Sequence, residues 1–344
     1  MMESMNILSI GAGAIGTYIG GSLALQGHNV TFVERPDVAE GLHTRGLKLN
    51  LLEQEYHFPN PQVVSSIEAA ISTQKFDVAL FALKSFDTAS FLETLPDDKA
   101  QIPAVLCLSN GVDNEPTLTA ALGSEKVIAG TVTSAIGRRG VGDIILERLR
   151  GIGVAAGHPL SERLVDALSE ARLKAQLFAN AADMKWSKML TNLIGNATAA
   201  ILDMPPGDIF AHPGLYQLEI QQLREALRVM RAQNIRLVDL PATPVRLLAF
   251  AVRFLPLAVS RPLLTKAVGG GRGGKMPSFH IDLHSGRGKS EVDYLNGAVV
   301  RAGEQHGIPT PVNRLLRDVL LHLTNGELSI EMYARKPESL LGML

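Results

Sequence analysis

The sequence predicts an α/β fold in which a parallel-sheet domain is followed by an all-α domain. In the first half of the chain, short apolar runs alternate with helical stretches, as in the βαβ units that build a parallel sheet. After about Ala155 the pattern changes to long helical segments. The length of 344 residues is more than one hydrophobic core usually spans. We therefore expect one domain over residues 1–178 and a second over residues 179–344.

Five short apolar runs are predicted to be strands of one sheet. They span Asn6–Ile10, Asn29–Glu34, Val78–Leu83, Ala104–Leu108 and Val127–Thr133. Five later segments have helical periodicity and span Ser161–Leu177, Met184–Ile201, Leu215–Gln233, Ser290–His306 and Val312–Asn325. The glycine-rich stretch Gly269–Lys275 predicts a mobile loop, and the pattern reveals no role for the segment 241–275 that contains it.

A glycine-rich turn joins the first predicted strand to the first predicted helix. It reads Gly11-Ala12-Gly13-Ala14-Ile15-Gly16 and matches the pattern Gly-x-Gly-x-x-Gly. The first glycine makes the turn, the second lets the backbone approach a pyrophosphate, and the third lets the helix pack closely on the strand. The phosphates then lie at a helix N-terminus, where backbone N–H groups favour anions. This context predicts a Rossmann-type dinucleotide-binding domain, with a chance glycine turn as the alternative.

Polar side chains follow three predicted strands, at the sheet edge where open α/β sheets bind ligands. Glu34 and Arg35 end the second strand, where an acid holds the ribose of NAD and an arginine holds the 2′-phosphate of NADP. Lys84 and Asn110 follow the next two strands. A solvated lysine and a turn-forming asparagine are their ordinary alternatives. Together with the glycine turn they favour a cofactor site, and the choice between NAD and NADP stays open.

A polar stripe marks one predicted helix of the second domain. Lys188, Asn192 and Asn196 are four residues apart and so share one helix face. Asparagine is a poor mid-helix residue, and the neighbours are mostly Leu, Ile and Ala, so a polar wall facing a cavity competes with a solvent-facing stripe. When hydride adds to a carbonyl carbon, an ammonium can stabilise the alkoxide-like oxygen and donate the proton. Lys188 is therefore the candidate catalytic residue of a ketone reduction.

The second domain contains two further candidates. Ser290-Glu291-Val292-Asp293 matches a capping box with Ser290 as the N-cap. Glu291 is either a carboxylate partner for the catalytic lysine or an acid favoured by the helix dipole. Ser278, which follows a proline, can bond a substrate oxygen or initiate a turn or helix. The residues by themselves leave these alternatives open.

Composition and charge exclude several classes of protein. A net charge of -1 gives no basic surface for nucleic acid. The N-terminus lacks the regions of a secretory signal, and charges and prolines interrupt the apolar segment Val245–Val268, so no membrane span is expected. The single cysteine, Cys107, lies in an apolar run, which predicts a small buried side chain. We expect a cytoplasmic enzyme.

From the glycine turn to about Leu316, the chain resembles the ketopantoate reductases, also called 2-dehydropantoate 2-reductases. Six ordered landmarks carry the likeness. They are Gly11–Gly16; Leu83-Lys84-Ser85; Asn110-Gly111 with Glu115; Trp186 with Lys188, Asn192 and Asn196; Pro277-Ser278 with Asp282; and Glu291–Gly297. The segment 241–275 looks longer than in compact members and could reshape the substrate pocket.

The resemblance implies reduction of 2-dehydropantoate to (R)-pantoate with NADPH, without a metal, in the synthesis of pantothenate and coenzyme A. It implies that Lys188 is the proton donor and that Glu291 lies near this lysine and the nicotinamide ribose. The residues that would hold the 2-oxo acid are Asn192, Asn196 and Ser278. Lys84 and Asn110 would serve the cofactor, with Asn110 also near the substrate. The implied fold is a Rossmann domain followed by a helical domain like that of 6-phosphogluconate dehydrogenase.

Two other functions stay open. One is the NAD(P)H-dependent reduction of a different, bulkier or more apolar 2-oxo acid by the same Lys188 and Glu291. The other is a non-catalytic dinucleotide-binding sensor, against which the retained lysine and glutamate argue. NADP is expected through Arg35, with NAD as the alternative because Glu34 precedes it. The expected partner is a small 2-oxo acid, and a homodimer is left open.

Overall fold

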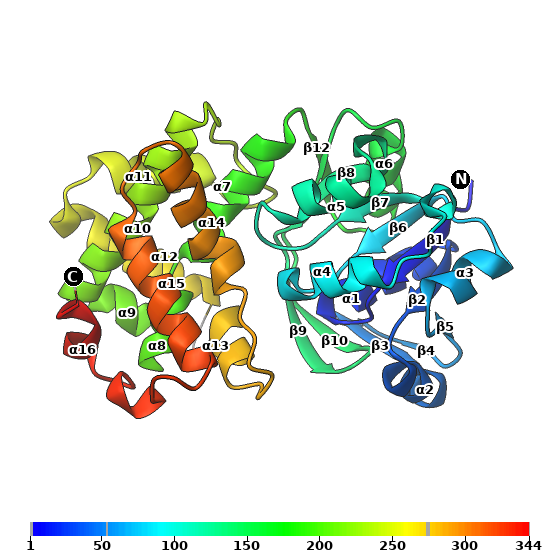
Figure 1. Cartoon of the computed structure of the whole chain (residues 1–344), viewed down its shortest axis with the longest axis horizontal. Coiled ribbons are helices and arrows are strands. Elements are labelled where there is room, and N and C mark those ends of the chain that lie inside the picture. Colours follow the sequence, from blue (N-terminus) through cyan, green and yellow to red (C-terminus); the bar gives the residue numbers. More distant parts are fainter. Residues whose placement is uncertain (1–2, 53, 273–275, 344) are drawn as a thin grey trace. The chain divides into compact units, whose positions relative to one another are not determined.

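The computed structural model describes residues 3–52, 54–272 and 276–343. It divides into two compact units, which Figure 1 shows in blue to green and in green to red. The first, here called the sheet unit, comprises Met1–Lys185 and Leu240–Thr243. The second, the helical unit, comprises Trp186–Asp239 and Pro244–Leu344.

The sheet unit contains an eight-stranded sheet in the order β12-β11-β8-β7-β6-β1-β2-β5. Its strands are β1 (Asn6–Ile10), β2 (Asn29–Val33), β5 (Gln62–Val64), β6 (Val78–Phe81), β7 (Ala104–Cys107), β8 (Val127–Val132), β11 (Ile152–Ala155) and β12 (Ala175–Phe178). All neighbours run parallel except β8 and β11. The five predicted strands are confirmed, and each ends at or just before its predicted end.

A hydrophobic core lies on each face of this sheet, which is why its central strands are unbroken apolar runs. Successive residues alternate between the cores, with Ile7 in one and Leu8 in the other. The first core includes side chains of α1 (Ala14–Leu25), α2 (Pro36–Arg45) and α6 (Ser161–Glu170). The second includes side chains of α3 (Ile67–Thr73), α4 (Thr88–Glu93) and α5 (Asn114–Leu122). The layered arrangement is that of a Rossmann-type domain.

A second, four-stranded sheet in the sheet unit was not predicted. Its order is β4-β3-β10-β9, with β3 (Leu47–Leu51), β4 (Gln54–Phe58), β9 (Ala135–Gly140) and β10 (Asp143–Arg148). The predicted helix Ser161–Leu177 is also wrong in its second half, because α6 ends at Glu170 and β12 follows. Arg172 and Lys174 have positive φ angles of 59° and 50°, which a continuing helix does not allow.

The helical unit begins within α7 and consists of helices, which confirms the predicted all-α pattern. The helices are α7 (Ala181–Leu193), α8 (Ala197–Leu202), α9 (Pro206–Ala211), α10 (Pro213–Ala232), α11 (Val245–Phe254), α12 (Leu257–Arg272), α13 (Ser278–Leu283), α14 (Val292–Gln305), α15 (Pro311–Thr324) and α16 (Pro337–Leu341). The long helix α10 packs against α9, α11, α14, α15 and α16, so it forms the centre of this unit (Figure 1).

Two predictions for this unit are corrected. The helix expected over Met184–Ile201 is interrupted at residues 194–196, where Gly195 has a φ of +56° that lets the chain turn. The stretch Gly269–Arg272 belongs to α12 rather than to a loop, since a helix tolerates glycine at about 1 kcal/mol each. The rest of the expected loop, Gly273–Lys275, lies outside the described residues.

The apolar segment Val245–Val268 forms α11 and most of α12. On α11 the side chains of Val245, Ala249 and Val252 are buried, whereas Leu247 and Phe250 are exposed. Within the described part of the chain, no helix is both long enough and apolar enough to cross a membrane.

Candidate functional site

The glycine turn has the geometry that its sequence predicts. It runs from the end of β1 into α1, whose N-cap is Gly13. Gly11 has a φ of +96°, a conformation that favours glycine, and a Cβ on Gly16 would overlap the carbonyl oxygen of Gly11. A Cβ on Gly13 would meet no atom within 4 Å, so the backbone there faces open space. The turn therefore offers an exposed backbone at a helix N-terminus, as a pyrophosphate requires.

Strand register brings the predicted cofactor residues to one edge of the sheet. Ile10 at the end of β1 pairs with Val33 on β2 and with Phe81 on β6. Phe81 in turn pairs with Cys107 on β7. The segments that follow these residues, with Gly11, Glu34, Lys84 and Asn110, thus leave the sheet side by side. The chain passes from β1 to β2 on one side and reaches β6 on the other, so this edge is a topological switch point.

Glu34 faces the glycine turn. The backbone N–H of Ala12 donates to its Oε1 at 2.6 Å, and the N–H of Arg35 donates to its Oε2 at 3.3 Å. The guanidinium of Arg35 lies 3.8 Å from the carboxylate of Asp37, and 73% of the Arg35 side chain is exposed. The carboxylate is therefore the group fixed beside the turn, and the guanidinium points into solvent.

Hydrogen bonds tie together the segments that carry Lys84 and Asn110, which are both half-buried. The Ser85 hydroxyl donates to the carbonyl oxygen of Asn110 at 2.9 Å. The amide of Asn114 donates to the same oxygen at 2.7 Å and accepts from the hydroxyl of Thr88 at 2.8 Å. These bonds hold the two segments in one arrangement at the switch point.

A buried ion pair near this edge escaped the sequence analysis. The ammonium of Lys185 lies 2.6 Å from a carboxylate oxygen of Glu115 and donates to the carbonyl oxygens of Ser109 at 2.7 Å and Gly130 at 3.2 Å. Burial lowers the pKa of Lys185, but the charge of Glu115, the nearby Cys107 and the hydrogen bond to Glu115 together outweigh burial, so the pKa lies above its ordinary value. The lysine thus links α7 to α5, to the loop after β7 and to β8. Its only sequence signal is a charge between apolar neighbours.

Cys107 is fully buried, which confirms its prediction as a small core side chain. Burial, and then the nearby charge of Glu115, raise the pKa of its thiol. The thiol is therefore not a nucleophile at neutral pH.

In the helical unit, Asn196 is hydrogen-bonded to two other predicted substrate residues, Asn192 and Ser278. Lys188 and Asn192 lie one turn apart on α7 and are half-buried. Asn196 lies beyond the end of that helix, so the expectation that all three share one helix is wrong. Its amide nitrogen donates to the carbonyl oxygen of Asn192 at 3.0 Å and to the hydroxyl of Ser278 at 3.3 Å, and its oxygen accepts from the N–H of Phe279 at 3.1 Å.

Glu219 on α10 stabilises the turn that carries Asn196. Its carboxylate accepts from the N–H of Gly195 at 2.8 Å, from the hydroxyl of Thr198, and from the side-chain amide of Gln222 at 2.8 Å. The side chain is fully buried. Sequence reasoning missed this residue, whose signal is an acid between Leu218 and Ile220 on an amphipathic helix.

Glu291 is buried and stands at the N-cap of α14, one residue before the first turn. The predicted capping box is not formed. The hydroxyl of Ser290 accepts from the N–H of Val292 at 3.2 Å, and the carboxylate of Asp293 pairs with Arg301 at 3.1 Å. In a capping box, the carboxylate of Asp293 would bond back to the N–H of the N-cap residue. Here it pairs instead with Arg301, two turns further along α14.

Comparison with known proteins assigns the chain to a family. The family model described as "Ketopantoate reductase PanE/ApbA" matches residues 7–156, and its C-terminal counterpart matches residues 180–324. The chain belongs to the ketopantoate reductase family. It is 26% identical over 331 residues to a 2-dehydropantoate 2-reductase of Archaeoglobus fulgidus, covering 94% of this chain and 100% of that protein. A 2-dehydropantoate 2-reductase of Streptococcus pyogenes is 23% identical, with 95% and 100% covered.

Solved structures of similar proteins have the same fold. A ketopantoate reductase of Ralstonia eutropha is similar with a TM-score of 0.78 and 26% identity, covering 93% of this chain and 99% of that one. D-mandelate dehydrogenase in complex with NADH shares the fold, with a TM-score of 0.75 and 23% identity over 94% of this chain and 100% of that one. This family member is thus an oxidoreductase, and its cofactor is a nicotinamide dinucleotide.

Proposed function

We propose that the chain reduces 2-dehydropantoate to (R)-pantoate in pantothenate and coenzyme A synthesis, with Lys188 as the proton donor. The observation that carries the proposal is the hydrogen-bonded set of Asn192, Asn196 and Ser278, in which Asn192 lies one helix turn from Lys188 on α7. An ammonium beside amide and hydroxyl groups suits a substrate that carries a carbonyl to be reduced and oxygens to be held.

Each residue of this set has a separate task. The dinucleotide supplies the hydride to the carbonyl carbon when it is bound. Lys188 stabilises the negative charge that grows on the carbonyl oxygen and gives that oxygen its proton. Asn192 and Ser278 bind the carboxylate and hydroxyl oxygens of the substrate. Asn196 is buried, and both its amide nitrogen and its oxygen have protein partners, so it acts on substrate by orienting Ser278.

The sheet unit holds the cofactor. The backbone of the turn Gly11–Gly16 receives the pyrophosphate at the start of α1, where the open space over Gly13 fits a close approach. Lys84 and Asn110 stand at the same sheet edge and bind the part of the dinucleotide that extends from the turn. Glu291, at the N-cap of α14, serves the nicotinamide ribose.

A panel of 2-oxo acids tests the proposed substrate. With NADH and NADPH supplied in turn, 2-dehydropantoate is expected to give the highest kcat/KM, followed by the absorbance of the reduced nicotinamide. Turnover of an aryl or branched 2-oxo acid without turnover of 2-dehydropantoate would reassign the substrate within the same chemistry. Cofactor binding without turnover of any acid would favour the sensor.

The contacts of Glu34 support NADH as the preferred cofactor. Its carboxylate is fixed at the glycine turn, where the adenosine ribose of a dinucleotide lies in Rossmann domains, and a carboxylate there binds ribose hydroxyls but repels a 2′-phosphate. Arg35 is exposed and paired with Asp37, so it offsets this repulsion only after leaving its partner.

Glu34→Ala is accordingly expected to raise the ratio of kcat/KM for NADPH to that for NADH by about tenfold or more. Two like charges about 4 Å apart repel by about 1 kcal/mol in water and by about 4 kcal/mol near a protein surface. Steady-state kinetics with both cofactors measure the ratio. Glu40→Ala, which removes an exposed acid from α2, is the matched control and is expected to leave it unchanged. An equal ratio in the Glu34 variant and wild type would contradict the assignment.

A further inference from the structure

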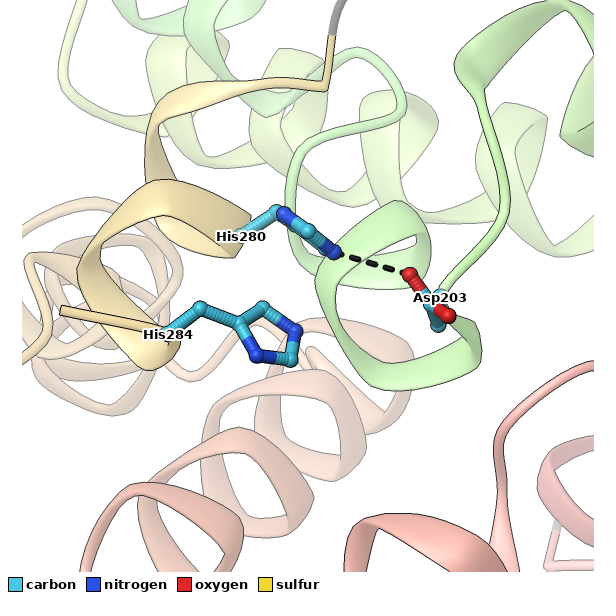
Figure 2. Close-up of side chains that lie close together, drawn as sticks. All are labelled: Asp203, His280 and His284. Carbon is cyan, nitrogen blue, oxygen red and sulfur yellow. Dashed lines mark hydrogen bonds and ion pairs between the residues drawn. The ribbon is translucent and has the colours of Figure 1, made fainter. Parts of the chain in front are cut away.

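Asp203, His280 and His284 gather in the helical unit in a cluster that the proposed reduction does not use. Figure 2 shows His280 on α13 and His284 at the C-cap of that helix, both projecting toward the turn that carries Asp203. The Nε2 of His280 lies 2.9 Å from Oδ1 of Asp203, and the two imidazole rings have centroids 4.2 Å apart. One candidate ligand atom from each residue lies within 4.8 Å of the other two.

We propose that these three residues bind a divalent transition-metal ion, with Zn²⁺ as the best-matched ion. The N–H of His284 donates to the carbonyl oxygen of His280 at 3.0 Å, so the two residues close one helical turn at the end of α13. Histidines at this spacing of four residues lie on one face, and zinc sites use this spacing. Two imidazoles and one carboxylate form a ligand set for Zn²⁺, Co²⁺ or Ni²⁺, whereas Mg²⁺ and Ca²⁺ prefer oxygen ligands only. With three protein ligands, water completes the coordination of the ion.

The backbone on both sides of the cluster is held in place without the metal. Asp203 is the C-cap of α8 and has the left-handed conformation, with φ of 47° and ψ of 48°. The start of α13 is fixed to the turn before α8, because Asn196 accepts from the N–H of Phe279. The carboxylate and the His280 ring therefore face each other across two elements that are already joined.

Binding requires only side-chain movement. Tetrahedral zinc holds nitrogen and oxygen ligands at about 2.0–2.2 Å, so ligand atoms are separated by roughly 3.3 Å. The ion replaces the hydrogen bond between His280 and Asp203 and binds one unprotonated nitrogen of each ring, while the other ring nitrogen keeps its proton. His284 is exposed and can rotate toward the other two ligands. The occupied site would tie α8 to α13, the helix that begins at Ser278.

Metal titration of the tag-free protein tests this proposal. Calorimetry with Zn²⁺ is expected to show one ion per chain, and Co²⁺ is expected to give visible absorption bands of a low-coordinate complex. Asp203→Asn and His284→Ala are each expected to weaken binding at least tenfold. Asparagine tolerates the left-handed backbone at position 203, and His284 is exposed, so both variants keep the fold. His306→Ala removes an exposed histidine from the end of α14 and should bind like wild type.

A thermal scan provides a measurement that needs no variant. An ion that binds the folded state alone raises Tm as its concentration exceeds Kd. We expect Zn²⁺ to raise Tm of the wild type and the His306 variant, but not that of the Asp203 or His284 variants. The proposal is overturned if no ion binds, or if both cluster variants keep wild-type affinity. It is equally overturned if the His306 variant loses affinity as they do.

Discussion

Replacing Lys188 by alanine is expected to lower kcat by about a thousandfold with little change in dinucleotide binding. A positioned general acid contributes about 10²–10⁴-fold to a proton-transfer step, and the ammonium also stabilises the growing charge on oxygen. The glycine turn and the other proposed cofactor residues of the sheet unit are untouched by this change. Stopped-flow kinetics would measure the chemical step, and the fluorescence of bound NADH would measure cofactor affinity.

Lys266→Ala is the matched control, because Lys266 is an exposed lysine on α12 of the same unit. It should retain wild-type kcat. Lys188→Arg keeps the charge but gives up no proton near neutral pH, so it separates the two roles of the lysine. A Lys188→Ala variant with kcat within a few-fold of wild type would eliminate Lys188 as the acid.

Lys185→Met is expected to lower the free energy of unfolding by about 3–5 kcal/mol, the usual cost of leaving one partner of a buried ion pair without the other. The substitution leaves the mostly buried Glu115 carboxylate without its charged partner and removes the donor from the carbonyl oxygens of Ser109 and Gly130. Urea titration would measure the loss. The single tryptophan, Trp186, is the next residue on α7 and reports unfolding by fluorescence.

The double variant Lys185→Met with Glu115→Leu should recover part of the loss, because it removes both charges together. The pair Arg314–Glu304 is exposed, so Arg314→Met is a control expected to change stability little. Since the pKa of Lys185 is raised in the folded protein, its stabilisation is complete below the ordinary lysine value and is lost only as pH rises through the folded pKa. A Lys185→Met variant as stable as wild type would show that the pair does not support the fold.

Much of the sheet unit can be predicted from sequence, because its strands and its glycine turn depend on neighbouring residues. Apolar runs such as Val78–Phe81 indicate strands buried on both faces, and the spacing of Gly11 to Gly16 indicates the turn. The four-stranded sheet was missed because strands such as Leu47–Leu51 are only partly buried and so form no unbroken apolar run. The sheet is completed only when β3 pairs with β10, almost a hundred residues away.

The residues of the candidate site are proposed from the sequence, but the sequence did not predict their arrangement. The landmarks that resemble the ketopantoate reductases include Lys188, Asn192, Asn196 and Ser278, yet their spacing suggested a single helix. The chain instead turns at Gly195, where Glu219 of α10 accepts the backbone N–H. A helix break of this kind depends on a buried carboxylate 24 residues further along the chain. The helical periodicity of the local sequence does not reveal such a break.

The sequence by itself determined the fold class, the dinucleotide turn and the family, since each depends on local patterns or ordered landmarks. Only the tertiary structure showed that Lys185 pairs with Glu115 and that Glu34 rather than Arg35 faces the turn. It also showed that Asp203 lies close to two histidines. The physical reason is that burial and charge pairing depend on residues brought together by folding. A charged residue has the same local pattern whether its partner lies across the core or in solvent.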